Sequence, residues 1–204
     1  YEAEAVPVAV DTDGPALEHF SPFGPLISRV RLPPELVDRI NDFADTRVSP
    51  GQSAEFLVPD ELVVFGGEQS LARYLGAQIR RYLSRTEGSA PERIGFEAFW
   101  IVSQYAETSS PVHFHSSDLA GVLYLKVPTI AADMQQQSYI SGRKAGWINF
   151  LIGGKQRLSK SLISFPPEVG DLYIFPGWLL HVAEPFVGAG ERRSMAFNVS
   201  ADAR

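Results

Sequence analysis

The spacing of apolar residues along the chain changes near residue 93. Two segments before it carry apolar side chains at the three- and four-residue spacing of an amphipathic helix. The first segment follows Pro33-Pro34, which suits the first turn of a helix, and the second spans about 68–84. Their apolar stripes consist of Leu36, Val37, Ile40, Phe43 and Ala44, and of Leu71, Leu75, Ile79, Tyr82 and Leu83. The alternating stretch 26–32 predicts a strand ahead of both helices.

After residue 93, short β-rich segments alternate with turn signals. This succession of strands after two helices predicts a mainly β fold, a jelly roll of the cupin-like type buttressed by N-terminal helices. The predicted strands lie near 94–105, 111–115, 120–127, 146–152, 160–165, 171–175, 179–184 and 192–200.

We expect a single domain over 1–204, with a loosely attached arm at 1–24, a helical support at 25–92 and the β core at 93–204. The stretch 49–67 contains several turn signals and predicts a long connection. The polar stretch 131–144 predicts a surface loop, with a mobile lid as the alternative.

Composition excludes some classes of partner. The net charge is −6, whereas a nucleic-acid-binding surface is normally basic. No apolar run approaches the roughly 20 residues of a membrane span, so neither nucleic acid nor a membrane is an expected partner. Cysteine is absent, which excludes a disulfide framework and a thiolate metal site and is compatible with a reducing compartment. The chain starts at Tyr1 rather than Met, so we expect a trimmed or engineered N-terminus. Separately, we expect a cytoplasmic location.

Histidine is the most informative residue type. The chain has four histidines, and three of them occur as His113-Phe-His115 and as His181, with Arg192 eleven positions further on. If 111–115 is a strand, His113 and His115 face the same side, because side chains alternate with period two. Two imidazoles on one face and a third from a later strand are typical of a metal site that stays open to substrate. The alternative is a pair of polar side chains on a solvent-exposed strand.

Four ordered motifs surround these histidines. They are His113-Phe-His115, then Gly121-Val-Leu-Tyr-Leu125, then Gly170-Asp-Leu-Tyr-Ile-Phe-Pro-Gly-Trp-Leu-Leu-His181, and finally Glu191-Arg192-Arg-Ser194-Met-Ala-Phe-Asn198. In these motifs the chain resembles the iron(II)/2-oxoglutarate-dependent oxygenases. More narrowly, it resembles a bacterial and phage family of them whose substrates are unassigned. The resemblance covers about residues 98–200, and the first ninety residues add a weaker likeness to the helices of prolyl-hydroxylase-like members.

The resemblance implies a double-stranded β-helix with Fe(II) at its open end and with 2-oxoglutarate and O2 as cosubstrates. It places His113 and His181 in the metal shell. It implies that Arg192 pairs with the far carboxylate of 2-oxoglutarate, a task that suits the bidentate fork of a guanidinium. Ser194, on the same strand face, could add a hydroxyl to that carboxylate. Tyr124 matches a cosubstrate-contacting tyrosine of the prolyl-hydroxylase-like enzymes, with plain barrel packing as the alternative.

The sequence departs from the wider superfamily at position 115, where an aspartate or glutamate is usual. Three interpretations follow: a three-histidine site, a site in which His115 only orients another ligand, or a site completed by Asp118. Strict alternation would face Asp118 away from the metal, although Ser116-Ser117 could turn the chain. We favour His115, because the narrower family also carries histidine there.

These features predict an oxygenase, most often a hydroxylase of an unactivated C–H bond, acting on a small molecule or a peptide. A cupin-like metal-dependent isomerase or hydrolase is the first alternative, although it would not require an arginine–serine pair after the last histidine. A non-catalytic jelly roll, metal-binding or metal-free, is the second. The retained spacing of three histidines disfavours a decayed site.

Overall fold

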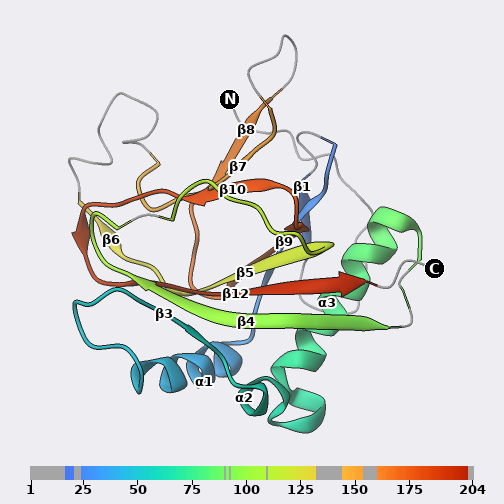
Figure 1. Cartoon of the computed structure of the whole chain (residues 1–204), viewed down its shortest axis with the longest axis horizontal. Helices are drawn as coiled ribbons and strands as arrows, with labels where there is room; N and C mark the ends of the chain where they lie inside the picture. The colour runs from blue at the N-terminus through green and yellow to red at the C-terminus, as the bar shows by residue number, and fades with distance from the viewer. Residues whose placement is uncertain are drawn as a thin grey trace.

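Two facing sheets and a layer of helices make up the protein in the computed structural model, which describes residues 17–20, 24–89, 91, 93–108, 110–131, 144–153 and 160–201. The main sheet has seven antiparallel strands in the order β1-β2-β9-β5-β12-β4-β3. The minor sheet has three, in the order β10-β7-β8, and a two-stranded ribbon pairs β11 with β6. Figure 1 shows the minor sheet on one side of the main sheet and the helices on the other.

The elements have the following bounds. The helical elements are α1 (Pro34–Asp45), α2 (Asp60–Val64), the 3-10 helix η1 (Gly67–Gln69) and α3 (Leu71–Glu87). The strands of the main sheet are β1 (Glu18–Phe20), β2 (Ile27–Arg31), β3 (Ala54–Leu57), β4 (Ile94–Gln104), β5 (Leu119–Lys126), β9 (Asp171–Pro176) and β12 (Arg192–Ala201). The remaining strands are β6 (Thr129–Ile130), β7 (Ile148–Leu151), β8 (Leu162–Phe165), β10 (Leu180–Ala183) and β11 (Gly188–Ala189).

The predicted mainly β fold with helical support is confirmed, and its two long helices begin and end for local reasons. Pro34 occupies the first turn of α1, where its missing N–H has no helical partner to lose. Ser70 caps α3, because its hydroxyl accepts a hydrogen bond from the Arg73 amide. Gly88 ends α3 with φ of 77°, a left-handed conformation that suits glycine. No helix of the described residues is long and apolar enough to cross a membrane.

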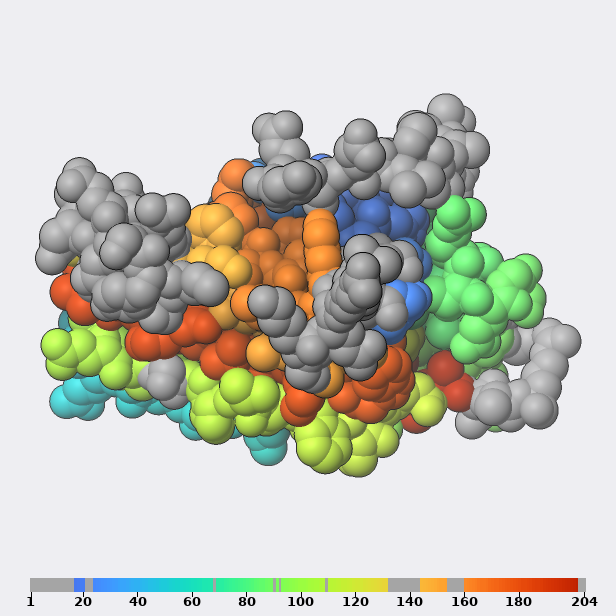
Figure 2. All heavy atoms as spheres, turned by 90° about the horizontal axis from the view of Figure 1, so that it is seen from above, coloured from blue at the N-terminus to red at the C-terminus, as the bar shows by residue number. Residues whose placement is uncertain are grey.

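Alternation along the main sheet divides its side chains between two cores. One face packs against α1 and α3 through Ile101, Leu123, Met195 and other apolar residues. The other face turns toward the minor sheet, where Tyr173 and further aromatic residues form a second core. Viewed from above, β7, β8 and β10 occupy the middle of this face in yellow and orange, and the end of α3 lies beside them in green (Figure 2).

The structure corrects several predicted boundaries. Residues 111–115 form no strand: only His113 pairs, in an isolated bridge to His181, because Pro111 has no N–H to donate and a bend follows at 116–118. The predicted connection 49–67 contains β3, α2 and the start of η1, and the predicted arm contributes β1 to the sheet edge. Residues 1–16 and 21–23 of the predicted arm, and residues 132–143 of the predicted loop, lie outside the described residues.

Candidate metal and cosubstrate site

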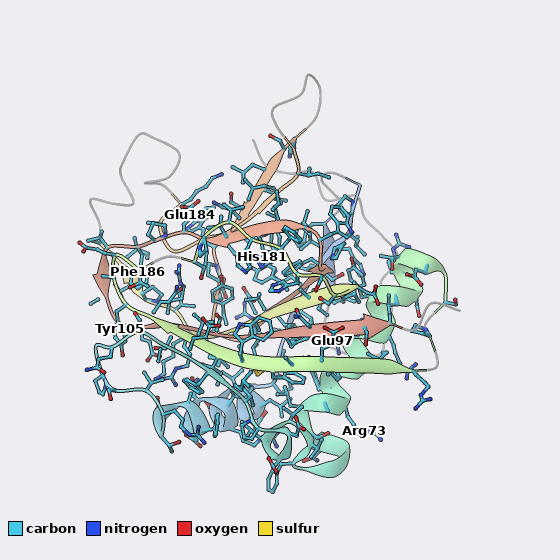
Figure 3. All side chains as sticks on the ribbon, viewed as in Figure 1. Arg73, Glu97, Tyr105, His181, Glu184 and Phe186 are labelled. Carbon is cyan, nitrogen blue, oxygen red and sulfur yellow. The ribbon has the colours of Figure 1, made fainter. Side chains whose placement is uncertain are left out.

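Three histidines from two distant parts of the chain meet between the sheets. His113, His115 and His181 offer ring nitrogens that all lie within 4.8 Å of one another. The ring centroids of His113 and His181 are 4.2 Å apart, and that of His115 lies 5.3 Å and 5.2 Å from the other two. Figure 3 shows His181 in the space between the minor sheet and the main sheet. The geometry is that of a group able to hold one metal ion.

Backbone pairing, rather than a strand, brings the histidines together. The amides and carbonyls of His113 and His181 exchange two hydrogen bonds, of 3.1 Å and 3.0 Å. The amide of His115 donates to the carbonyl of Gly177 at 2.8 Å. A Cβ at position 177 would lie 2.0 Å from the Ser117 carbonyl oxygen, so this close approach requires glycine. The turn after β9 therefore holds the histidine pair against β10.

Hydrogen bonds to carbonyls fix the tautomers of two of the rings. Nδ1 of His113 lies 2.8 Å from the carbonyl oxygen of Pro111, and Nδ1 of His181 lies 3.0 Å from that of Leu179. A carbonyl oxygen only accepts, so each Nδ1 carries the proton and donates it. Nε2 of both rings is left as a lone-pair donor. A histidine that binds a metal through one ring nitrogen usually donates the N–H of the other to such an acceptor.

Burial favours the neutral form of His181 and His115. The pKa of His181 is lowered to about 4, chiefly by desolvation; the hydrogen bond to the Leu179 carbonyl opposes this shift, and the neighbouring His113 and His115 contribute to it. Desolvation also lowers the pKa of His115, followed by the effect of His113. Neutral rings are the form that binds a metal, so the site is prepared for one at neutral pH.

The three histidines line a small cavity between the sheets, and Arg192 lines the same cavity. Only 2% of the surface of Arg192 is exposed. Its Nε and NH2 donate to the side-chain carbonyl of Gln104 at 3.1 Å and 2.6 Å, NH1 donates to the Glu184 carbonyl, and NH2 donates to the Thr108 carbonyl at 3.4 Å. Burial lowers the pKa of Arg192, an effect opposed by Tyr124 and Glu184. Within the described residues, no carboxylate forms an ion pair with this guanidinium. A buried positive charge without a paired anion favours an anionic ligand.

Arg193 lies on the opposite face of β12. Its guanidinium pairs with Glu191 at 2.6 Å and with Asp45 of α1 at 2.8 Å, and it is 1% exposed. Alternation along β12 thus separates two neighbouring arginines, one toward the cavity and one toward the helices. Nothing in the sequence indicated that Arg193 would also be buried.

Tyr124 and Ser194 complete the cavity wall opposite the histidines. They face each other as paired residues of β5 and β12, and both line the cavity together with the three histidines and Arg192. Tyr124 is 1% exposed, and desolvation raises the pKa of its phenol to about 12, so it stays a hydrogen-bond donor. The cavity itself has a volume of about 60 Å³.

Asp118 does not join the histidines. Its carboxylate accepts a hydrogen bond from the Ala201 amide at 2.9 Å, at the end of β12. It lines a separate, larger hollow rather than the cavity that contains Arg192. Sequence reasoning also missed Gln104, and for Trp100 it favoured core packing over a place in a pocket, yet both line the cavity. The only sequence signal for them is that they are four residues apart on one predicted strand, so that both face the same side of it.

This arrangement predicts a clear ranking of two variants in metal binding. We expect His115→Ala to lower the affinity for Mn(II) by more than about 100-fold, because it removes one of three converging nitrogens, whereas a residue that only orients a ligand costs about 10–100-fold. Asp118→Ala should change that affinity by less than about 2-fold, since its carboxylate is engaged at Ala201. Titration calorimetry of both variants, with circular dichroism to verify folding, measures this. Loss of binding in Asp118→Ala with retention in His115→Ala would assign the third ligand to the carboxylate.

Comparison with known proteins places this geometry in a class. Residues 98–198 match the family described as "Putative 2OG-Fe(II) oxygenase". The structure is similar to viral collagen prolyl hydroxylase from Paramecium Bursaria Chlorella virus-1, solved as a 2OG complex. The identity is 14% and the TM-score 0.56, over 87% of this chain and 96% of that one. A prolyl-4-hydroxylase from Pseudomonas putida has an identity of 15% and a TM-score of 0.55, over 87% of this chain and 93% of that one. No curated protein matches the chain.

The fold is accordingly the double-stranded β-helix of the 2-oxoglutarate oxygenases, as predicted. The chain belongs to the 2OG-Fe(II) oxygenase family, whose match spans the segment from β4 to β12. It is therefore a dioxygenase, and the family uses Fe(II), 2-oxoglutarate and O2. The donor set fits these groups, because imidazole nitrogens suit Fe(II) and an unpaired buried guanidinium suits a dicarboxylate.

Proposed function

We propose that this dioxygenase is a hydroxylase in which His113, His115 and His181 hold Fe(II). Arg192 pairs with the far carboxylate of 2-oxoglutarate, and Ser194 and Tyr124 add hydroxyl groups beside it. When bound, these groups supply the oxidising chemistry: one atom of O2 enters a C–H bond of the substrate, and the other enters succinate as 2-oxoglutarate loses CO2. The chain itself binds, orients and shields.

The observation that carries this proposal is the guanidinium of Arg192 in the cavity lined by the three histidines. A buried charge of this kind is costly unless an anion meets it, and within the part of the chain that the structure describes the oxygens that accept from it are uncharged carbonyls. An isomerase or hydrolase of the cupin type has no need of such a group. The position of Arg192 therefore supports a dicarboxylate cosubstrate.

The ligand set also has a consequence for charge. Three neutral imidazoles leave the two positive charges of the metal uncompensated, unlike a set with one carboxylate. The anionic cosubstrate then balances the metal directly, so metal and 2-oxoglutarate strengthen each other's binding. Water is kept from this part of the site by the aromatic side chains around His181, among them Phe150 and Phe175.

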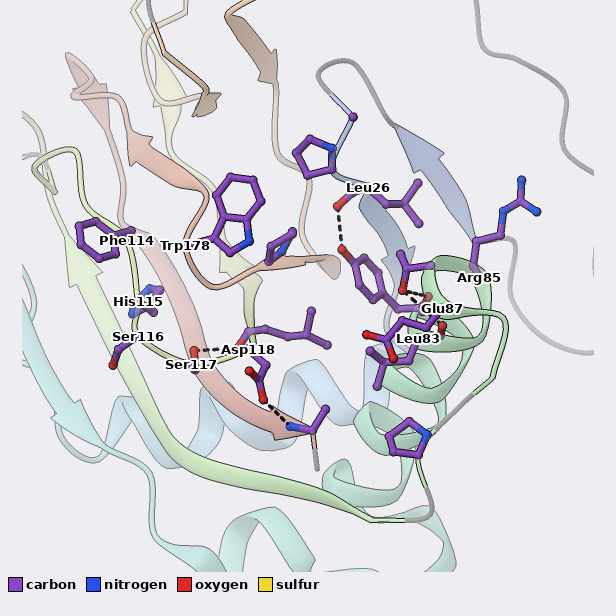
Figure 4. A pocket seen from close by; sticks show the side chains of 18 residues that line it. Leu26, Leu83, Arg85, Glu87, Phe114, His115, Ser116, Ser117, Asp118 and Trp178 are labelled. Carbon is purple, nitrogen blue, oxygen red and sulfur yellow. Dashed lines mark hydrogen bonds between the residues drawn. The ribbon is translucent and has the colours of Figure 1, made fainter. Parts of the chain in front are cut away.

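The substrate would approach from the larger hollow. This hollow has a volume of about 980 Å³ and touches His115, which also lines the small cavity. Figure 4 shows Phe114 and Trp178 on one side of the hollow and the end of α3 on the other. These two aromatic side chains are 62% and 54% exposed, and both line the hollow, where they offer apolar surface to a substrate.

The size of the hollow, at the upper end of the range for small-molecule sites, favours a peptide over a small metabolite. Among proteins of similar fold, a prolyl hydroxylase from Trichoplax adhaerens was solved with a hypoxia inducible factor peptide fragment, at 12% identity and a TM-score of 0.52. That likeness covers 82% of this chain and 77% of that one. A small molecule is the second possibility.

The test is substrate-dependent hydroxylation. The Fe(II)-loaded protein is incubated with 2-oxoglutarate and ¹⁸O2 across a panel of peptides, amino acids and small metabolites. We expect succinate, together with a product that has gained one labelled oxygen atom. Trp178→Ala should raise KM for that substrate and leave the affinity for 2-oxoglutarate unchanged, since Trp178 lines only the larger hollow. Failure of the wild type to convert 2-oxoglutarate to succinate under any condition of the panel would contradict the proposal.

A further inference from the structure

Gln104 is the side chain that engages the guanidinium of Arg192 most closely. It ends β4 directly opposite Arg192, which begins β12, and it is 7% exposed. Its side-chain oxygen receives both the Nε and the NH2 hydrogen bond, at 3.1 Å and 2.6 Å. One side-chain oxygen therefore occupies the whole Nε–NH2 edge of the guanidinium. NH1 and NH2 also donate to the main-chain carbonyls of Glu184 and Thr108, and the Thr108 contact, at 3.4 Å, is the longest of the four and the one a carboxylate would most easily replace.

The orientation of the Gln104 amide follows from its two neighbours. A guanidinium has only donors, so the amide oxygen must face it and the amide nitrogen must face away. The nitrogen donates to the hydroxyl of Ser110 at 3.2 Å. Ser110 stands three residues before His113, so Gln104 joins the arginine of β12 to the segment that carries two of the histidines.

The neutrality of Gln104 matters as much as its geometry. A glutamate at this position would present an oxygen at nearly the same place with a negative charge, and would form a buried ion pair with Arg192. The amide oxygen orients the guanidinium without neutralising it. The positive charge thus remains available to a dicarboxylate that enters the cavity.

We propose that Gln104 is a positioning residue that holds Arg192 ready for the far carboxylate of 2-oxoglutarate and keeps its charge uncompensated. This inference rests on the proposed role of Arg192. It extends that role, because it assigns a function to a neutral side chain that touches the arginine and need not touch the metal.

Two variants separate orientation from charge. Gln104→Met keeps the size of the side chain and removes the hydrogen bonds, so the affinity for 2-oxoglutarate should fall about 10-fold. Gln104→Glu keeps an acceptor and adds a charge that competes for the guanidinium, so the affinity should fall about 100-fold. Both are measured by calorimetry on Mn(II)-loaded protein, alongside the affinity for Mn(II) itself, which should stay within about 2-fold of wild type.

Gln78 provides a matched control. It is also buried, at 4% exposure, and also accepts a hydrogen bond from an arginine, Arg81, but it lies on α3 outside both cavities. Gln78→Met and Gln78→Glu should leave the affinity for 2-oxoglutarate unchanged.

Three results would overturn the inference. They are wild-type or tighter 2-oxoglutarate binding in Gln104→Met, unchanged binding in Gln104→Glu, and a parallel fall in Mn(II) affinity, which would indicate a general structural role. If any one of these results occurs while Arg192→Met still abolishes 2-oxoglutarate binding, the proposed function stands and only the role of Gln104 is wrong. If the wild type does not bind 2-oxoglutarate, the proposed function falls and this inference with it.

Discussion

His181→Ala is expected to lower the affinity for Mn(II) by more than about 100-fold, beyond the 10–100-fold loss typical of a residue that only orients a ligand. Its ring is 4% exposed, its Nδ1 proton is engaged by the Leu179 carbonyl, and its Nε2 is free to bind. Removing it leaves two imidazoles, which are too few to hold a divalent ion against water. His113→Ala should behave in the same way, because its Nδ1 is engaged by Pro111.

The fourth histidine is the control for this experiment. His19 lies in β1, and its Nδ1 is 2.8 Å from the hydroxyl of Ser28 on β2. His19→Ala should bind Mn(II) as the wild type does. Calorimetry measures the three affinities, and thermal unfolding with and without Mn(II) gives an independent value, since a ligand that binds the folded state raises its stability. Wild-type binding in His181→Ala would remove the basis for a three-histidine centre.

The sequence predicted the two long helices and missed the short elements between them. The stripes that include Leu36 and Leu75 repeat over enough turns to identify α1 and α3. By contrast, β3 is four residues long and α2 five, so neither carries enough period to be recognised within 49–67. These short elements are defined by what they pair with, and β3 exists because β4 offers it an edge.

The sequence indicated which residues to expect at the candidate site but not how the chain brings them together. The histidines were expected to share a strand face, yet only His113 makes a ladder contact, and the rings converge because Gly177 lets the chain approach closely. Gln104 could not be found from sequence, because its role depends on being opposite Arg192 in the sheet. That pairing joins residues 88 positions apart and has no local signal.

Arg192→Met is expected to weaken 2-oxoglutarate binding by about 100-fold or more, because a charge-assisted bidentate contact is lost from a buried site. Arg192→Lys keeps the charge but not the planar fork, and should weaken binding by about 10-fold. Both dissociation constants are measured on Mn(II)-loaded protein. Wild-type affinity in Arg192→Met would mean that the far carboxylate of 2-oxoglutarate is bound elsewhere.

The neighbouring arginine distinguishes binding from folding. Arg193→Met should leave 2-oxoglutarate binding nearly unchanged while it lowers the free energy of unfolding by about 2 kcal/mol. Glu191, which is 10% exposed, loses its closest charged partner and keeps only Lys126 at 3.3 Å and the Ser103 hydroxyl at 2.7 Å. Asp45, the other partner, is 55% exposed and loses little. Urea unfolding measures the stability of both variants.

Arg192 and Arg193 are adjacent, carry the same charge and are equally buried, so only the face of β12 that each occupies can separate their effects. A weaker 2-oxoglutarate affinity in folded Arg193→Met, with normal affinity in Arg192→Met, would place the cosubstrate on the helix side of the sheet.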